Sequence, residues 1–344
     1  MFDALDVVGN PAALHRAGQR AKARLEEARE ELARAVGCEA TEVVFTSGGS
    51  EADTLGVLGA WTHSRQPRAL VSAIEHPAVL GAVEHGAARI PVSADGVVDL
   101  SAMQASMDGD VGVVSVMAVN NETGRTQDVD QFATQAFGWD AHFHTDAVQS
   151  FHDLPWSFEV GSMAISAHKI GGPVGIGALI LKKRSNLAPV GLGGGQERKI
   201  RSGTQMVALA AGFAAAATEA RESADQETSR LRSWNDTITA AVDDIGATVN
   251  SRGGAPHIVN ATFHGTRADD VLFLLDSAGV HASVGSACRA GVHQPSEVLL
   301  AMGRSVEDAS ATLRFSMGWN TTEADVDRLL DVLPGAVERA RSAY

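Results

Sequence analysis

The sequence predicts an α/β fold with a mostly parallel sheet and a second, smaller α+β domain. Short apolar runs alternate with helix-like stretches through roughly the first 200 residues, which is typical of βαβ units. Hydrophobic residues make up 44% of the 344 residues, enough for a sizeable core, and 35 glycines separate the segments. No internal repeat and no low-complexity linker interrupts this pattern.

The apolar runs predict the strands of the large domain. They lie at residues 42–45, 69–73, 111–119, 141–147, 163–167 and 176–181. Helices are predicted at residues 12–36, 77–87 and 129–138. The first of them is followed by Gly37, at the position where a glycine commonly ends a helix.

The second half of the chain changes character. Residues 204–244 are rich in Ala and charged residues and predict one or two helices that leave the sheet. After residue 246, the segments PHIVNATFHG and ATLRFSMG predict strands, and ADDVLFLLDSAG and residues 322–343 predict helices. We therefore expect a large α/β domain over residues 10–215 and a small α+β domain over residues 216–344, joined by the first residues of the chain.

Composition excludes several function classes. The net charge of −14 disfavours a protein whose main task is binding nucleic acid or an anionic membrane surface. Two cysteines cannot form a disulfide framework, the N-terminus does not read as a signal peptide, and no apolar run reaches the ~18 residues of a membrane span. We expect a cytoplasmic enzyme without direct nucleic-acid or membrane partners.

Two motifs suggest an anionic, nitrogen-containing ligand. In FTSGGSEADTLG (residues 45–56), a predicted strand passes through a small-residue turn into a helix, where free N–H groups and a Ser hydroxyl suit a phosphate. In HTDAVQS (residues 144–150), Asp146 ends a strand, and an acid there could hold a protonated ring nitrogen. Taken singly, the glycine-rich turn is more often purely structural, and Asp146 is also compatible with a turn or helix-cap residue.

Two further motifs supply nucleophiles. In ISAHKIGGPVGIGAL, Lys169 stands between two apolar strands, so we expect desolvation to lower its pKa toward that of a lysine that can form a Schiff base. In SVGSACRAGVHQPSEVLLAMG, Cys288 stands in a loop rich in Gly, Ser and Ala, where a thiol can be reactive. Cys38 follows a helix-ending glycine and is assigned to structure, as are His142, His144, His152 and His293, whose spacing fits no zinc pattern.

Taken together, these motifs resemble the cysteine desulfurase family of pyridoxal phosphate enzymes, in its branch with a long mobile cysteine loop. The resemblance covers nearly the whole chain. The matching motifs, in the family's order, are FTSGGSEAD, EHPAVL, VNNETG, HTDAVQS, SAHKIGGPVGIGAL, GGGQERKIRSGT, GSACRAG and LRFSMG. The resemblance implies the fold type I of pyridoxal phosphate-dependent transferases, with a sheet of the seven-stranded type.

The resemblance also implies residue roles. Lys169 would bind the cofactor aldehyde, Asp146 would pair with the pyridine nitrogen, and His76 would stack on the ring and shuttle protons. The other expected cofactor-binding residues are Gly49, Ser50, Asn121, Gln149, Ser166, His168 and Thr204.

For the substrate, the resemblance implies that Asn121 and Arg314 bind the carboxylate of L-cysteine. The Cys288 thiolate would take the substrate sulfur, leaving L-alanine and a persulfide for a sulfur-acceptor protein such as an iron–sulfur scaffold or a thiolation enzyme. Thr204 would reach the cofactor phosphate of a neighbouring subunit, which implies a homodimer. No metal is required.

Alternatives remain at this point. A selenocysteine lyase or an aminotransferase relative would share the fold, although transamination needs no thiol at Cys288. Family members usually begin with a segment of the type Leu-Asp-Asn-Ala-Ala-Thr-Thr-Pro, whereas this sequence begins MFDALDVVGNP. An inactive accessory protein on the same fold is therefore a third candidate.

Overall fold

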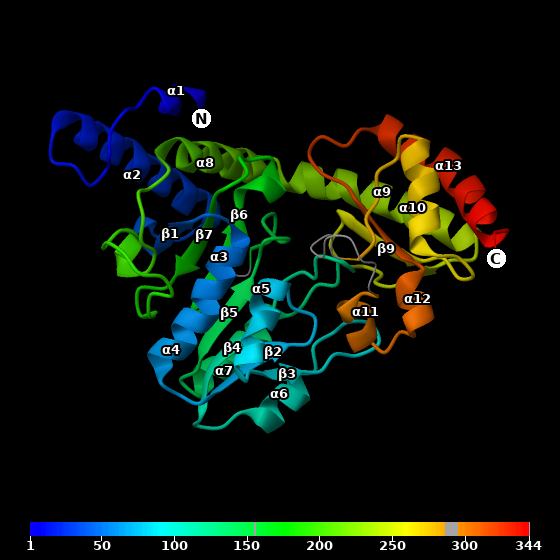
Figure 1. Cartoon of the computed structure of the whole chain (residues 1–344), viewed down its shortest axis with the longest axis horizontal. Helices are drawn as coiled ribbons and strands as arrows, with labels where there is room; N and C mark the ends of the chain where they lie inside the picture. Colours follow the sequence, from blue (N-terminus) through cyan, green and yellow to red (C-terminus); the bar gives the residue numbers. More distant parts are fainter. Residues whose placement is uncertain (155, 286–294, 344) are drawn as a thin grey trace. The chain divides into compact units, whose positions relative to one another are not determined.

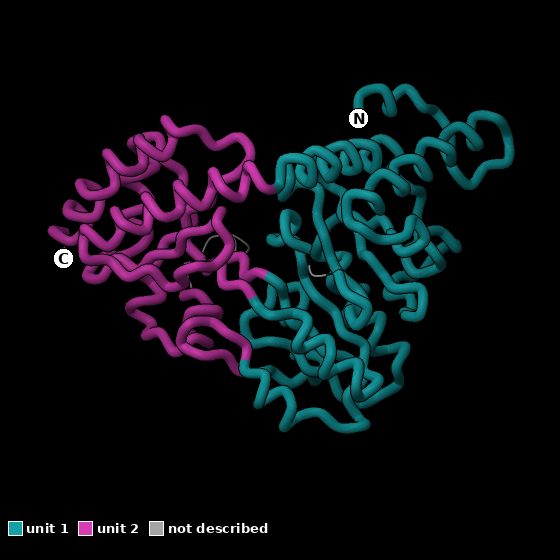
Figure 2. The backbone as a smooth tube through the Cα atoms, turned by 180° about the vertical axis from the view of Figure 1, so that it is seen from behind, with its two compact units in different colours: residues 1–90, 99–118, 127–224 teal, residues 91–98, 119–126, 225–344 magenta. Residues whose placement is uncertain are grey.

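The computed structural model describes residues 1–154, 156–285 and 295–343, which form two compact units (Figure 1). Figure 2 colours the first unit, residues 1–90, 99–118 and 127–224, and the second, residues 91–98, 119–126 and 225–344. The boundary predicted after residue 215 falls within helix α8 (Val207–Glu222) and stays a prediction.

The first unit contains a seven-stranded sheet of the predicted class. Its strands are β1 (Val43–Thr46), β2 (Arg68–Ser72), β3 (Ala88–Ile90), β4 (Val111–Ser115), β5 (His142–Asp146), β6 (Ser162–Ser166) and β7 (Gly177–Leu181). Their order is β1-β7-β6-β5-β4-β2-β3, and β7 is antiparallel to both neighbours while the other pairs are parallel. Six of the strands lie on the predicted apolar runs; β3 was missed because it has three residues, two of them exposed.

The strand directions create one functional edge. Because β7 runs against both β1 and β6, strands β1, β6, β5, β4 and β2 all point the same way. Their carboxyl ends therefore meet at one edge of the sheet, the edge at which open α/β sheets bind ligands.

Helices cover this sheet. The α-helices of the first unit are α1 (Phe2–Leu5), α2 (Arg16–Val36), α3 (Gly49–Thr54), α4 (Ala60–Ser64), α5 (Pro77–Leu80), α6 (Leu100–Ser106), α7 (Val129–Gly138) and α8. Helix α2 ends at Gly37 in the left-handed conformation (φ 80°), as the sequence predicts. It packs along α8, whose buried face is mostly alanine, so the two backbones approach closely (Figure 1).

The second unit has its own sheet and core. Strands β8 (Thr248–Val249), β9 (Ile258–Thr262) and β10 (Thr312–Ser316) form an antiparallel sheet in the order β10-β9-β8. Its helices are α9 (Ala224–Asp244), α10 (Ala268–Ser277), α11 (Glu297–Ala301), α12 (Val306–Ser310) and α13 (Glu323–Arg341). In the core, Phe263 and Phe315 meet edge to face with ring centroids 6.3 Å apart.

None of the helices within the described ranges combines the length and apolarity needed to cross a membrane.

A π-helical turn connects α3 and α4. It covers Leu55–Gly59, and Gly56 within it packs on the ring of buried His144 of β5. A Cβ atom built on Gly56 would lie 2.3 Å from His144 Nδ1, closer than van der Waals contact allows. The absence of a side chain at residue 56 therefore lets this helix lie against the sheet above β5.

We predict that Gly56→Ala lowers the free energy of unfolding by about 1–3 kcal/mol, the usual cost of overpacking a core. Urea denaturation measures this loss. The control is Gly138→Ala at the exposed end of α7, where an added Cβ meets no atom within 4 Å. Equal stability of the two variants would show that the contact between Gly56 and His144 is not tight.

Candidate functional site

Four of the predicted site residues follow the carboxyl ends of neighbouring strands in the first unit. Asp146 is the last residue of β5, and Ser166 is the last residue of β6. Lys169 lies in the 3-10 turn Ala167–Ile170 directly after β6, and His76 follows β2 as the N-cap of α5. The parallel topology thus gathers residues that are distant in sequence at one edge of the sheet.

Asp146 is a buried carboxylate with one firm hydrogen bond. Its side chain is 5% exposed, and Oδ1 accepts the backbone N–H of Val148 over 2.9 Å. Burial raises the pKa of Asp146, while the Val148 N–H, His76 and Lys169 act in the opposite direction. A buried acid of this kind is suited to hold a cation.

His76 and Lys169 lie near enough to Asp146 to influence its charge. His76 is half-buried, and its Nδ1 accepts the N–H of Ala78 over 3.1 Å. The pKa of His76 is lowered, mainly because the ring is partly buried. The positive charge of Lys169 also lowers this pKa, and the negative charge of Asp146 opposes the shift. The structure therefore brings the predicted ring-stacking, ring-pairing and aldehyde-binding residues together.

The predicted burial of Lys169 is wrong. The residue is exposed, although the strands on either side of it, β6 and β7, are buried throughout. The strand ends at Ser166, and the 3-10 turn carries the lysine beyond the edge of the sheet. Burial of the flanking strands does not extend to the turn between them.

The predicted phosphate-binding turn lies at the same edge. Gly49 and Ser50 begin α3 directly after β1, and the amides of a first helical turn have no intrahelical acceptor. A Cβ atom at Gly49 would lie 2.7 Å from Val148 Cγ2 and 3.6 Å from Ser166 Cβ, so this turn is next to β5 and β6. The Ser166 hydroxyl is 2.9 Å from Nδ1 of exposed His168.

Three other predicted residues have different positions. Gln149 is half-buried in the turn after Asp146, and Thr204 is exposed in the segment before α8. Cys288 lies outside the described residues. Cys38 is half-buried, and burial raises the pKa of its thiol to about 12, which agrees with a structural role.

Asn121 and Arg314 belong to the second unit, where they contact each other. The Arg314 guanidinium donates to the Asn121 carbonyl over 2.7 Å and to the Ser283 hydroxyl over 3.3 Å. Glu122, next to Asn121, is buried and accepts a hydrogen bond from Ser296 over 2.5 Å. Burial raises the pKa of Glu122, and Arg314 acts against this rise.

Two buried acids near the site were missed by the sequence analysis. Glu75 is 1% exposed; its Oε1 accepts the Ser72 hydroxyl over 2.6 Å and the Met117 N–H over 2.7 Å. Burial, reinforced by Asp146, raises the pKa of Glu75 to about 8. Burial, Asp146 and Glu75 also raise the pKa of Asp53. Glu75 stands in the motif EHPAVL and Asp53 in the motif FTSGGSEAD. Their closeness in sequence to the selected residues was the one signal that could have pointed to them.

Asp53 belongs to a closed polar network beneath α3. His144 Nε2 is 3.2 Å from Asp53 Oδ1, and His144 Nδ1 is 2.9 Å from Ser162 Oγ. His142 Nε2 is 2.7 Å from the same hydroxyl. Burial lowers the pKa of His144 to about 3 and that of His142 to about 4, so both rings are neutral at neutral pH. Both histidine side chains therefore have hydrogen-bond partners within the protein. The described residues contain no group of three or more His, Cys, Asp or Glu side chains suited to a metal ion.

Comparison with known proteins identifies the family. The model of the aminotransferase class-V family matches residues 4–329. The chain belongs to the class-V aminotransferase family. Members of this family use pyridoxal phosphate.

Full-length relatives of this class-V aminotransferase carry the name cysteine desulfurase. An IscS-like cysteine desulfurase of Mycobacterium tuberculosis is 41% identical, with 98% of this chain and 91% of that protein covered. A solved NifS-like protein superposes with a TM-score of 0.89 at 29% identity, over 97% of this chain and 93% of that chain. The structure titled SspA in complex with cysteine gives a TM-score of 0.78 at 29% identity, over 91% of each chain.

The residues present in this chain fit the family's cofactor. A protonated pyridine nitrogen requires a buried carboxylate, which Asp146 supplies. A phosphate requires amide and hydroxyl donors, which the Gly49–Ser50 turn and Ser166 supply. Val148 packs against buried Gly49 and leaves no space for a side chain there, so only glycine fits at this point of the turn.

We predict that Glu75→Gln flattens the alkaline loss of stability. The folded protein keeps the Glu75 proton up to about pH 8, whereas the unfolded chain releases it near 4.5, so stability falls as pH rises through this interval. A neutral amide removes this dependence. Urea unfolding of both proteins across the interval measures it; the depressed histidines contribute equally to each and cancel. Parallel curves would contradict a buried, protonated Glu75.

Proposed function

We propose that this protein is a pyridoxal phosphate-dependent cysteine desulfurase that converts L-cysteine to L-alanine and leaves a persulfide on Cys288. The observation that carries the proposal is the meeting of His76, Asp146 and Lys169 at one sheet edge in a chain that matches cysteine desulfurases over nearly its full length.

In this proposal, the residues of the first unit hold the cofactor. Lys169 would bind its aldehyde carbon, and the position of this exposed residue on a turn suits exchange with a substrate amine. Asp146 would hold the proton on the ring nitrogen, and His76 would cover the ring face. The bound cofactor supplies an electron sink for the substrate carbanion.

The anion-binding residues complete the cofactor site. Gly49, Ser50, Ser166 and His168 would bind the phosphate, and Gln149 with Asn121 would contact the phenolic oxygen. The hydrogen bond between Ser166 and His168 supports this role, because it fixes the two side chains together and leaves one N–H or O–H donor of the pair for the phosphate.

Arg314 would bind the substrate carboxylate together with Asn121. One guanidinium nitrogen of Arg314 is already fixed by the Asn121 carbonyl, which limits the rotation of a long side chain. A guanidinium with restricted motion loses less entropy when it binds a carboxylate.

Besides the bound cofactor, the sulfur transfer needs only the thiol of this chain and the substrate. The Cys288 thiolate attacks the substrate sulfur, the S–S bond forms, and the Cβ–S bond breaks with its electron pair left on Cβ. A proton on Cβ then completes L-alanine, so the reaction needs no external oxidant or reductant. Cys38 is unsuited to this role because its raised thiol pKa leaves almost no thiolate at neutral pH.

The proposal includes a cytoplasmic homodimer and a sulfur acceptor. Thr204, which is exposed, would contact the cofactor phosphate of the partner subunit. The persulfide would pass to an acceptor protein such as an iron–sulfur scaffold or a thiolation enzyme; the name of the IscS-like relative supports an acceptor of the first kind.

We predict that Lys169→Ala abolishes covalent attachment of the cofactor, since the proposed amine is removed. Borohydride reduction of the reconstituted protein, followed by peptide mass spectrometry, should locate the cofactor on residue 169 in the wild type and nowhere in the variant. Lys183→Ala, at an exposed lysine elsewhere on this unit, should behave as the wild type. Attachment at another lysine in the Lys169→Ala protein would refute the assignment.

We predict that Cys288→Ala binds the cofactor and L-cysteine but releases no sulfide and carries no persulfide. Alanine and sulfide production from L-cysteine, with mass spectrometry of the protein, measures this. Cys38→Ala is the matched control and should keep full turnover, because its thiol is not ionised at neutral pH. Equal sulfide release by Cys288→Ala and the wild type would favour a different reaction on the same fold.

A further inference from the structure

The segment before α8 contains a strained turn. Glu197, Arg198 and Lys199 have φ values of 40°, 58° and 63°, three consecutive non-glycine residues in the left-handed region. This conformation is unfavourable for L-residues and persists only where surrounding contacts fix it. Thr204 follows this turn by five residues, so the contacts that fix the turn also determine where the threonine lies.

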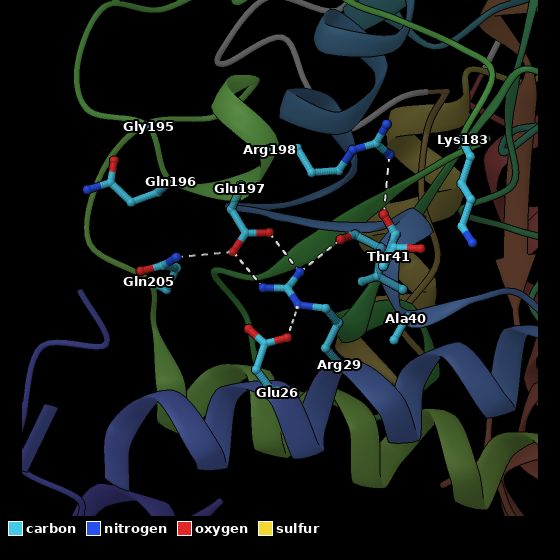
Figure 3. Close-up of a pocket in the computed structure, with 11 residues that line it drawn as sticks. Glu26, Arg29, Ala40, Thr41, Lys183, Gly195, Gln196, Glu197, Arg198 and Gln205 are labelled. Atoms are coloured by element: carbon cyan, nitrogen blue, oxygen red, sulfur yellow. Dashed lines mark hydrogen bonds and ion pairs between the residues drawn. The ribbon is translucent and has the colours of Figure 1, made fainter. Parts of the chain in front are cut away.

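Glu197 fixes one end of the segment. It is buried and receives both outer nitrogens of Arg29 from α2, each at 2.8 Å (Figure 3). Its Oε2 also accepts the backbone N–H of Phe45 in β1 over 2.9 Å. The pair forms part of the wall of a cavity of about 530 Å³. The strained turn is therefore attached to both the edge strand and the long helix of the first unit.

Arg201 fixes the other end to the predicted phosphate-binding turn. Its Nε donates to Glu51 Oε1 over 3.0 Å, and Glu51 accepts the backbone N–H of Ser47 as well. Burial raises the pKa of Glu51, but the hydrogen bonds from Arg201 and Ser47 outweigh it and hold the pKa below its ordinary value. Glu51 directly follows Ser50, so this ion pair joins the phosphate-binding turn to the segment that carries Thr204.

Hydrogen bonds on both sides of Thr204 complete the arrangement. The Gly203 N–H donates to Gln196 Oε1 over 3.2 Å, and Gln205 Nε2 donates to Glu197 Oε1 over 3.4 Å. Thr204 itself is exposed, and hydrogen bonds hold the residues on both sides of it.

We propose that Glu51 and Arg201 are positioning residues for the cofactor phosphate, acting on Ser50 in their own subunit and on Thr204 toward the partner subunit. This inference rests on the proposed function, because it uses the dimer and the cofactor named there. One ion pair then orients donors for two phosphates, and its loss weakens phosphate recognition at both sites of the dimer.

The test compares two ligands of apo-dimers: pyridoxal phosphate and pyridoxal, which lacks the phosphate. For Glu51→Gln and Arg201→Gln, we expect the Kd of pyridoxal phosphate to rise about tenfold, the lower end of the range for loss of a charge-assisted hydrogen bond, while the Kd of pyridoxal changes less than about twofold. Absorbance titration measures both constants. Arg201→Lys, which keeps the charge but not the forked donor, should fall between these variants and the wild type.

Controls separate this inference from the proposed function. Lys183→Gln breaks an exposed ion pair with Glu39 on the same unit and should leave both constants unchanged. Equal weakening of both ligands in Glu51→Gln and Arg201→Lys would indicate a general structural role and overturn the inference, as would unchanged affinities in a dimeric protein. A wild type that binds neither ligand, or that sediments as a monomer, would instead contradict the proposed function.

Discussion

The burial of three carboxyl groups at the carboxyl edge of the seven-stranded sheet is the constraint on which the candidate site depends. Asp53, Glu75 and Asp146 are each at most 5% exposed, and burial together with their mutual repulsion opposes ionisation. Asp146 differs because Val148, His76 and Lys169 favour its charged form. It is therefore the acid of the three best placed to carry a charge, and a protonated ring nitrogen would supply the compensating cation.

The contrast between Asp146 and Lys169 assigns different physical tasks to the two residues. The aspartate is enclosed and fixed by a backbone N–H, so it can hold a ring in one orientation. The lysine lies exposed on a turn, and in the proposed reaction its amine would leave and return during turnover. A rigid acid and an accessible amine suit a cofactor that keeps its ring position while its covalent partner changes.

The polar networks behind the site keep this edge rigid. Glu75 joins the turn after β2 to the end of β4 through Ser72 and Met117, and His144 joins β5 and β6 to α3 through Ser162 and Asp53. In the proposed site, these networks would act on Asp146 and His76 by connecting the strand ends that these residues follow.

Features that depend on residues close together in the sequence could be predicted, whereas contacts between residues far apart in the sequence could not. Helix α7, the end of α2 at Gly37 and six strands depend on local patterns and were predicted, and the motifs located the residues at the sheet edge. The π-turn depends on a contact between Gly56 and His144, and the pairs Arg29–Glu197 and Glu51–Arg201 join residues at least 150 positions apart. No local pattern encodes such pairs, although Glu197 and both members of the Glu51–Arg201 pair stand in motifs that were already selected. A motif residue with no assigned task, such as Glu197 in GGGQERKIRSGT, is therefore the place to look for a long-range partner.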